Sequence, residues 1–486
     1  MRALWLSAIV LSCSLTAADA PAPRRLAEYL SGDTRLIQDV QDLCDRMGGR
    51  LTGSENCNRA IEWGAARFKE IGVDRVSSEE FTVPHRWTPV TAEARVIKPA
   101  AFPLRIAAAP FTPSTPGRDP IEARIVVAGE GTADDFAMLG SKARGTIALV
   151  LSKEIRTLDD LFAEYMKNPV VMAAAHKAGV AAVLWQGSHP RGLLYRHPMS
   201  FTSAPAPVPV AVLAREQADR IARLAEKEDV TVRLLLRNEN GGAFQSRNVV
   251  ADIRGRDKPD EIVLLGAHLD SWDLGTGAED NGINAALVIN VARAIKKLGL
   301  QPRRTMRFVL WTGEENGMWG SAGYVISHAA ELDQHVATIT FDIGSGKTLG
   351  FFLNGRDELR KPVNDALEAA GLSAPEHALD AIDGTDNLDF LLSGVPNLVA
   401  NQDATAYVPD YHAESDTPER VNAQEARRNA AIAAAVMWAF AENPERPARR
   451  QSKAEVDKLI TDTKLDEQMR MFGQWDDWTS GRRGRH

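Results

Sequence analysis

Apolar strands alternate with amphipathic helices through the second half of the chain, and this alternation restricts the fold more than any other feature. An amphipathic helix is predicted over 284–299, with further helices at about 357–371 and 422–441. Near-continuous apolar strands between helices are typical of a mostly parallel mixed sheet covered on both faces, an α/β fold. The predicted strands are NVVADIRG (248–255), EIVLLGAH (261–268), TMRFVLWT (305–312), ATITFDI (337–343) and VPNLVANQ (395–402).

The first half predicts a second, smaller α/β unit. Residues 24–72 indicate two helices around the turn MGGRLTGSENC, and prolines then accumulate around 98–120. A self-contained pattern of short strands and helices follows, which favours an inserted domain. After about residue 445 the chain becomes polar, and we expect a surface helix and a frayed end there. The predicted division is a signal peptide (1–20), a catalytic domain (24–95 and 235–445), an inserted domain (96–234) and a C-terminal tail (446–486).

The first twenty residues predict export from the cytoplasm. They carry one positive charge, an apolar run of about ten residues and the cleavage-site pattern Ala18-Asp19-Ala20. The apolar run is too short for a membrane-spanning helix, which needs about 20 residues. A loose lipid-attachment pattern ending at Cys13 keeps a lipid-anchored form as the alternative. We therefore expect a secreted or periplasmic protein without a transmembrane segment.

Composition excludes several other classes. The chain is 44% hydrophobic and 25% charged, as in globular proteins, and its net charge of −8 and lack of a long basic run exclude nucleic-acid binding. Arg482, Arg483 and Arg485 are interpreted as a solvated end. Cys44 and Cys57 lie beyond the signal; a disulfide and two separate buried thiols are equally compatible with the sequence.

The stretch FDIGSGKT at 341–348 has the ending of a nucleotide-binding loop. That pattern also needs a glycine five residues before Gly346, where this chain has Phe341, so a nucleotide site is not predicted. The candidate functional residue of this stretch is instead Asp342, the acid before the turn.

Polar residues with metal-binding chemistry follow the predicted strands. Alone, each has an ordinary explanation: an Asp before a helix is usually an N-cap, and a lone His is usually a hydrogen-bonded loop residue. In a parallel sheet, however, the carboxyl ends of the strands meet in one crevice. Carboxylates gathered there without matching bases require cations. The candidates are His268, Asp270, Asp280, Glu314, Glu315, Asp342 and His412.

Imidazole and carboxylate ligands favour zinc, and the charges favour two ions per chain. Asp280, Glu315 and Asp342 supply three negative charges, so two Zn²⁺ and one shared hydroxide would make the cluster neutral. Glu314 is then a spare carboxylate able to take a proton from water and pass it to a leaving amine. Asp270 is expected to contact the second ring nitrogen of His268 and fix its tautomer.

The set H-x-D, D-N-G, E-E, D-x-G and Y-H-x-x-x-D resembles the co-catalytic di-zinc exopeptidases, which include secreted aminopeptidases and carboxypeptidase Q (plasma glutamate carboxypeptidase). The HLDSWD segment at 268–273 is most similar to the carboxypeptidase Q branch. The resemblance covers about 30–95 and 235–445, including R-L-T-G-S at 50–54, and the segment 120–232 is similar to a protease-associated domain.

The resemblance implies a role for each candidate. Asp280 would bridge the two zinc ions, His268 and Asp342 would complete one site, and Glu315 and His412 the other. It also implies a cis peptide after Asp280. The chain departs from the usual pattern at Ile283-Asn284, where Ser-Gly is common. It departs again at Asn387 in Gly384-Thr385-Asp386-Asn387, where His is frequent near the substrate, so the substrate preference stays open.

The predicted function is hydrolysis of short peptides or dipeptides through a metal-bridged hydroxide, by an aminopeptidase or a carboxypeptidase Q-like dipeptidase. Two alternatives share the fold: a catalytically silent receptor or binding module, which loses ligands, and a glutaminyl cyclase-like acyltransferase with a single zinc. All five ligands and the base are present in this chain, which favours the hydrolase. A homodimer and the role of the inserted domain are left open.

Overall fold

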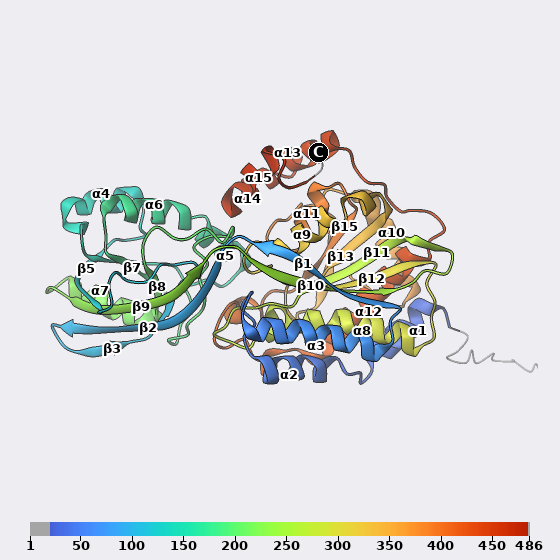
Figure 1. Ribbon diagram of the computed structural model, residues 1–486, viewed down its shortest axis with the longest axis horizontal. Coiled ribbons are helices and arrows are strands. Elements are labelled where there is room, and N and C mark those ends of the chain that lie inside the picture. Colours follow the sequence, from blue (N-terminus) through green and yellow to red (C-terminus); the bar gives the residue numbers. More distant parts are fainter. Residues whose placement is uncertain (1–19, 485–486) are drawn as a thin grey trace, which may run out of the picture.

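The computed structural model describes residues 20–484 and contains two β-sheets, each with its own helices (Figure 1). The predicted signal peptide, Cys13 and Arg485 therefore fall outside the described residues, except for Ala20. Within the described chain, none of the helices combines the length and the apolar character needed to cross a membrane.

The first sheet has seven strands in the order β1-β10-β12-β11-β13-β15-β14. The central strands β12, β11, β13 and β15 run parallel, whereas β1, β10 and β14 pair antiparallel at the edges. The prediction of a mostly parallel mixed sheet is confirmed, with its parallel part at the centre. The strands are β1 (Arg75–Val83), β10 (Phe244–Ile253), β11 (Lys258–His268), β12 (Arg304–Trp311), β13 (His335–Thr340), β14 (Thr348–Phe352) and β15 (Asn397–Gln402).

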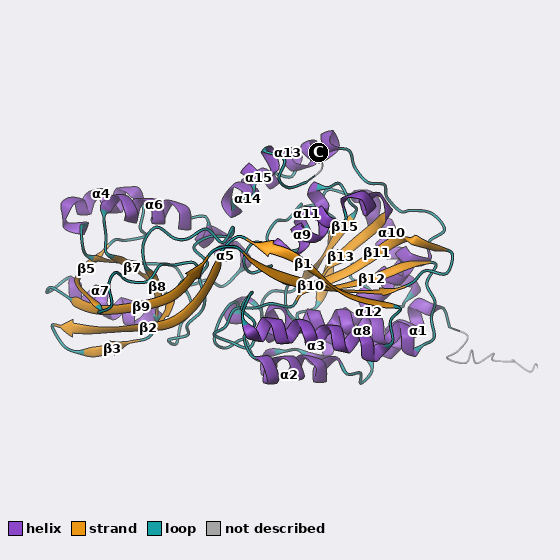
Figure 2. Cartoon of the chain, in the orientation of Figure 1, coloured by secondary structure: helices purple, strands orange, loops and turns teal. Residues whose placement is uncertain are grey.

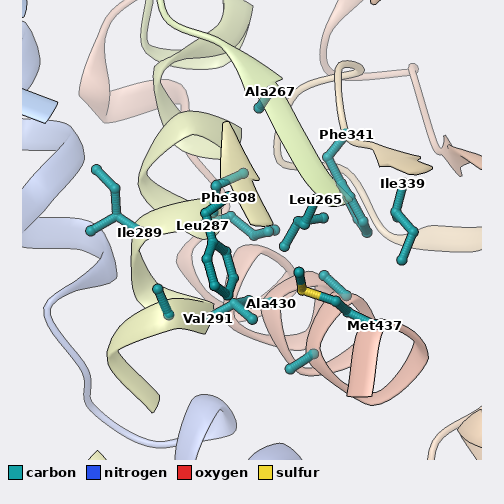
Figure 3. Packing of buried hydrophobic residues seen from close by; sticks show 14 of the residues in the cluster. Leu265, Ala267, Leu287, Ile289, Val291, Phe308, Ile339, Phe341, Ala430 and Met437 are labelled. Atoms are coloured by element: carbon teal, nitrogen blue, oxygen red, sulfur yellow. The ribbon is translucent and has the colours of Figure 1, made fainter. Parts of the chain in front are cut away.

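Helices cover both faces of this sheet (Figure 2). On one face, α3, α8 and α12 contact the strands, and the shorter α9 packs on the other face against β1 and β10. The main core lies between the first group and the sheet, where Leu265, Phe308 and Ile339 meet Leu287 and Met437 (Figure 3). The helices are α1 (Ala22–Ser31), α2 (Leu36–Met47), α3 (Glu55–Ile71), α8 (Ile283–Lys297), α9 (Trp319–Ser327), α10 (Arg360–Ala369), α11 (Leu388–Leu392) and α12 (Ala423–Glu442).

The second sheet has eight strands in the order β3-β2-β9-β5-β6-β7-β8-β4. Its strands are β2 (Arg86–Lys98), β3 (Phe102–Leu104), β4 (Ile106–Ala108), β5 (Ile121–Val127), β6 (Ile147–Val150), β7 (Ala182–Gln186), β8 (Val210–Leu213) and β9 (Thr231–Gly241). Its helices are α4 (Ala133–Leu139), α5 (Leu158–Tyr165), α6 (Asn168–Ala178) and α7 (Arg215–Ala225).

Strands β2 and β9 carry the chain into and out of this second sheet. They pair antiparallel from Arg86 opposite Gly241 to Lys98 opposite Thr231. The sheet therefore starts before the predicted boundary at 96 and ends after 234. The sequence has no turn signal where β2 and β9 leave the first domain, because both strands continue without interruption across the boundary. The prolines that suggested a boundary lie instead at the C-terminal end of β2.

The N-terminal region contains three helices where two were predicted. The stretch 24–72 is divided a second time between α1 and α2, because Gly32 ends α1 in an extended conformation. The following turn at 33–35 separates the helices before the predicted turn at 47–57 is reached. Among the described residues, Cys44 and Cys57 are both free buried thiols.

The C-terminal tail is folded rather than frayed. It forms α13 (Lys453–Asp462), α14 (Leu465–Phe472) and α15 (Trp475–Thr479), which Figure 1 shows above α9 and α11. Their apolar side chains pack with those of α11 in one buried cluster. Arg483 was expected to be solvated but is 4% exposed, and it donates to the Gly317 carbonyl at 2.9 Å. A polar composition conceals this packing because the apolar positions are few and widely spaced.

Candidate active site

The five predicted metal ligands converge at the carboxyl-terminal edge of the first sheet. His268 is the last residue of β11, Glu315 follows β12, Asp342 follows β13, and His412 lies in the loop after β15, while Asp280 lies in the turn before α8. All five are buried, with at most 8% of each residue exposed. Residues separated by up to 144 positions thus share one place because parallel strands end at the same edge.

Asp280 lies at the centre of the cluster, with one carboxylate oxygen facing each histidine. Its Oδ1 is 3.2 Å from His268 Nε2, and its Oδ2 is 3.3 Å from His412 Nε2. His268 Nε2 is also 2.9 Å from Asp342 Oδ1, and His412 Nε2 is 3.0 Å from Glu315 Oε2. The five side chains therefore form two His–carboxylate groups that share Asp280. This is the division that two ions with one bridging carboxylate require.

The tautomer of each histidine is set by its other ring nitrogen. His268 Nδ1 lies 3.0 Å from the main-chain carbonyl of Asp270, and His412 Nδ1 lies 3.3 Å from the carbonyl of Arg196. A carbonyl oxygen can only accept, so Nδ1–H is the donor in both rings. The Nε2 atoms are therefore left to face the carboxylates as potential metal ligands.

Electrostatics mark the cluster as a site that needs cations. Burial lowers the pKa of His412, but Glu315 and Asp280 outweigh it and raise the pKa to about 9. Burial also acts against ionisation of Asp280, yet hydrogen bonds from both histidines hold the pKa of this carboxyl below its usual value. For Glu315, burial dominates and raises the pKa to about 7. Without a metal ion, protons on the histidines balance the negative charge of the buried carboxylates. Bound metal ions could balance the same negative charge instead.

The donor set fits zinc. Ligand atoms of His268, Asp280 and Glu315 all lie within 4.8 Å of one another. Glu315 Oε1 is buried without a hydrogen-bond partner among the described residues, which is costly unless another group binds it. Imidazole nitrogen and carboxylate oxygen are zinc ligands. The Asp280–Asn281 peptide is cis.

Glu314 and Asp270 lie beside the ligands. Glu314 Oε2 is 3.9 Å from His268 Nε2, and its side chain keeps 12% of its surface exposed towards the pocket. Burial raises the pKa of Glu314 well above its usual value. The Asp270 carboxylate was expected at His268 Nδ1; its Oδ1 lies 3.7 Å from that nitrogen, and the main-chain carbonyl of Asp270 is the nearer acceptor at 3.0 Å. The carboxylate instead accepts from Thr52 Oγ1 at 2.5 Å and from the Gly313 N–H at 2.9 Å, which fixes the start of the Glu314 loop.

The glycine turn after Asp342 supports the cluster rather than a phosphate. Gly344 has a φ of +62°, and a Cβ there would lie 2.4 Å from Glu279 Oε2. Glu279 accepts from the N–H and the hydroxyl of Ser345 at 2.7 and 2.6 Å. Thr348 then begins strand β14, whereas a nucleotide-binding loop leads into a helix. The rejection of a nucleotide site agrees with this geometry.

Three supporting residues were not predicted. Asp416 accepts from the N–H groups of Glu279 and Asp280 at 2.7 and 3.1 Å, and the Tyr-His-x-x-x-Asp motif already contained it. Arg50 is fully buried and donates to the Leu269 carbonyl at 2.6 Å, within the R-L-T-G-S segment.

Arg196 is the third, and it comes from the region of the second sheet. Its main-chain N–H donates to the His412 carbonyl at 3.0 Å, and its guanidinium pairs with both oxygens of Asp273 at 2.8 Å. His412 has a φ of +55°, a region that residues other than Gly seldom adopt, so a neighbouring loop that fixes it has a structural role. No local sequence signal marks Arg196, because its partners lie far away along the chain.

A pocket of about 160 Å³ opens onto the cluster. One end contains the acidic and imidazole groups described above. The remainder is mainly apolar and is formed by three parts of the chain: the first sheet and its loops, α5 together with the loop between β7 and β8, and the C-terminal tail. Gly384 and Thr385, predicted near the substrate, also line it. None of its lining residues in the described chain is Lys or Arg.

Known proteins resemble the chain both in sequence and in structure. Residues 248–437 match Peptidase family M28. A crystal structure of a peptidase M28 precursor from Shewanella amazonensis SB2B is 30% identical, with 89% of this chain and 98% of that chain covered and a TM-score of 0.78. Bovine (Bos taurus) carboxypeptidase Q is 29% identical over 423 residues, which cover 86% of this chain and 88% of the relative.

A zinc aminopeptidase from Bacillus subtilis shares the fold, with a TM-score of 0.67 at 19% identity over 86% of this chain and 98% of that one. The match to Peptidase family M28, over residues 248–437, contains all five clustered residues. The similarity to the Shewanella protein extends over nearly the whole of both chains. The protein is therefore a metallopeptidase that belongs to Peptidase family M28.

Proposed function

We propose that the protein is a zinc-dependent exopeptidase that holds two ions and releases residues from the free amino end of short peptides. The position of Asp280 between two histidines carries this proposal, because each of its oxygens faces one ring. His268 and Asp342 would hold one ion, and Glu315 and His412 the other. A single-zinc cyclase would not need both groups, and a silent binding module would not need to retain them.

Bound zinc would lower the pKa of a water molecule, so that hydroxide is available at neutral pH, and would polarise the scissile carbonyl. Glu314 is proposed as the general base. It lies next to the ligands without belonging to either His–carboxylate group, and part of its side chain reaches the pocket. It would take a proton from the attacking water and deliver it to the departing amine. Asp270 supports it by holding the Gly313 N–H directly before it.

The charges around the pocket favour recognition of an amino end. A free carboxylate on the substrate would require a cation, and the lining residues of the described chain include no Lys or Arg. The acidic side chains instead suit an ammonium group. The similarity to carboxypeptidase Q supports a second candidate, a dipeptidase, in which the substrate's carboxyl end is recognised as well.

Activity on a panel of short substrates tests these proposals. The panel consists of a dipeptide, its N-acetylated form, its C-amidated form and an aminoacyl amide, each with and without a chelator. An aminopeptidase should lose activity only on N-acetylation, whereas a dipeptidase should lose it when either end is blocked. Cleavage that survives both N-acetylation and chelation would contradict the proposed function. Zinc analysis should give two ions per chain.

The N-terminal composition supports export. The apolar run before Ala18-Asp19-Ala20 would deliver the enzyme to the periplasm or the medium, with lipid attachment at Cys13 as the alternative. Cell fractionation with mass spectrometry of the mature N-terminus separates the two forms, because only the lipid-anchored one begins at a modified Cys13. We further propose that the second sheet is an inserted domain that completes the active site through the loop at Arg196.

A further inference from the structure

The C-terminal tail reaches the active site through one side chain, Phe472. Phe472 ends α14 and lines the same pocket as His268 and Glu314. It is 4% exposed. It lies outside the segment 248–437 that matches the peptidase family, so the family match assigns it no role.

Aromatic rings from two other segments meet Phe472 at this wall. The ring of Phe201 lies 4.6 Å from that of Phe472, centroid to centroid, at an interplanar angle of 88°. Phe162 of α5 approaches from another side at 6.2 Å and 78°, and Tyr165 contacts Phe201 at 4.8 Å. Edge-to-face contacts at these distances fix the ring positions. Phe472 thus joins the tail to α5 and to the loop between β7 and β8, and together they close the apolar side of the pocket.

The tail is anchored in a way that fixes this wall relative to the catalytic base. Arg483 donates to the Gly317 carbonyl at 2.9 Å and lies 4.9 Å from the Trp319 ring. Gly317 itself lines the pocket, three residues after Glu314. Met469 packs with the α11 cluster one turn before Phe472. The wall is therefore supported by contacts that do not involve Phe472.

We infer that Phe472 is a specificity-determining residue that selects an apolar side chain on the residue released from the amino end. The inference rests on the proposed function, because it takes the pocket beside the metal ligands as the substrate's. An ammonium group would face the acidic end while the side chain projects against Phe472, Phe201 and Phe162. A substrate with a short side chain leaves this wall without a contact and gains less from the apolar surface.

The test compares kcat/KM for leucyl and alanyl p-nitroanilides in the zinc-loaded full-length enzyme. The ratio of the two values is independent of the fraction of enzyme that is folded, so partial loss of stability does not obscure it. One extra or missing methylene group in an apolar pocket changes kcat/KM by about 10–200-fold. Phe472→Ala should therefore lower the Leu/Ala ratio about tenfold. Phe472→Leu, which keeps an apolar wall and disturbs packing less, should lower the ratio by a smaller factor.

Trp475→Ala is the matched control, since it removes an aromatic ring from the same tail at a position outside the pocket. Its Leu/Ala ratio should stay at the wild-type value. A ratio that remains within threefold of wild type, or rises, in both Phe472 variants overturns the inference while leaving the proposed function intact. A wild-type enzyme that cleaves neither p-nitroanilide refutes the proposed aminopeptidase activity, leaves the dipeptidase as the remaining candidate, and overturns this inference.

Discussion

Arg196 and Asp273 form an ion pair at the junction of the two sheets, and removal of Asp273 should destabilise the protein more than removal of Arg196. The Arg196 side chain is 5% exposed, donates both to Asp273 and to the Ala108 carbonyl, and lies over the Trp87 ring at 5.4 Å. The Asp273 side chain is 28% exposed. Removal of Asp273 leaves a buried guanidinium without its counter-ion, whereas removal of Arg196 leaves a carboxylate that water can reach.

Removing one partner of a buried pair costs about 3–5 kcal/mol. We expect Asp273→Leu to lower the free energy of unfolding by about this amount. Arg196→Met keeps the apolar length of the side chain and should cost about 2 kcal/mol, mainly from lost charge-assisted hydrogen bonds. In the double variant Arg196→Met/Asp273→Leu no buried charge remains unpaired. Its loss should be close to that of Arg196→Met alone, so the coupling energy should be about 3–5 kcal/mol.

Urea unfolding of the zinc-free protein at pH 7, followed by tryptophan fluorescence and circular dichroism, measures these values. The same variants should bind zinc less tightly at the His412 site, because the main chain of Arg196 contacts His412 on two sides. Two results would refute the reasoning: a larger loss for Arg196→Met than for Asp273→Leu, or a coupling energy below about 0.5 kcal/mol. Either would mean that the pair contributes no specific stability at the junction.

Three further predictions address the catalytic base, the metal and the pH dependence. Glu314→Gln should retain both zinc ions and lose turnover by at least about 100-fold, since a general base contributes about 10²–10⁴; near wild-type turnover would contradict this role. His412→Ala should reduce the zinc content from two ions to one in elemental analysis, and unchanged stoichiometry would exclude His412 as a ligand. Burial lowers the pKa of His197 to about 3. Between pH 6.5 and 3 the unfolded chain therefore binds a proton that the folded protein does not, and the free energy of unfolding decreases as the pH is lowered. By pH 5 this loss is about 2 kcal/mol, and His197→Gln should remove it in urea unfolding at pH 7 and 5; an unchanged pH dependence would contradict it.

Much of the first sheet could be predicted because its signal is local. Each central strand is a short apolar run, and a residue that the structure brings to the site lies at its end or in the loop that follows, as with His268 at the end of β11 and Asp342 after β13. The order of the strands was not needed for this prediction. Parallel strands place their carboxyl ends at one edge whatever their order.

The long antiparallel strands and the tail could not be predicted in the same way. Strands β1, β2 and β9 contain many polar residues, because one face of each is solvated, and the pairings of β1 with β10 and of β2 with β9 join residues more than a hundred positions apart. The tail helices carry few apolar residues, and only their contact with α11 gives these a buried surface.

The sequence by itself determined the alternation of strands and helices, the identity of the five ligand candidates and the spare carboxylate of Glu314. Tertiary structure alone decided which atoms serve them. The main-chain carbonyl of Asp270 accepts the hydrogen bond from His268 Nδ1, Arg196 reaches His412 from the region of the other sheet, and Phe472 completes the pocket from the end of the chain. The physical reason is that ligand chemistry is a property of residue type and local spacing. Hydrogen-bond partners and pocket walls depend instead on contacts between segments far apart in the chain.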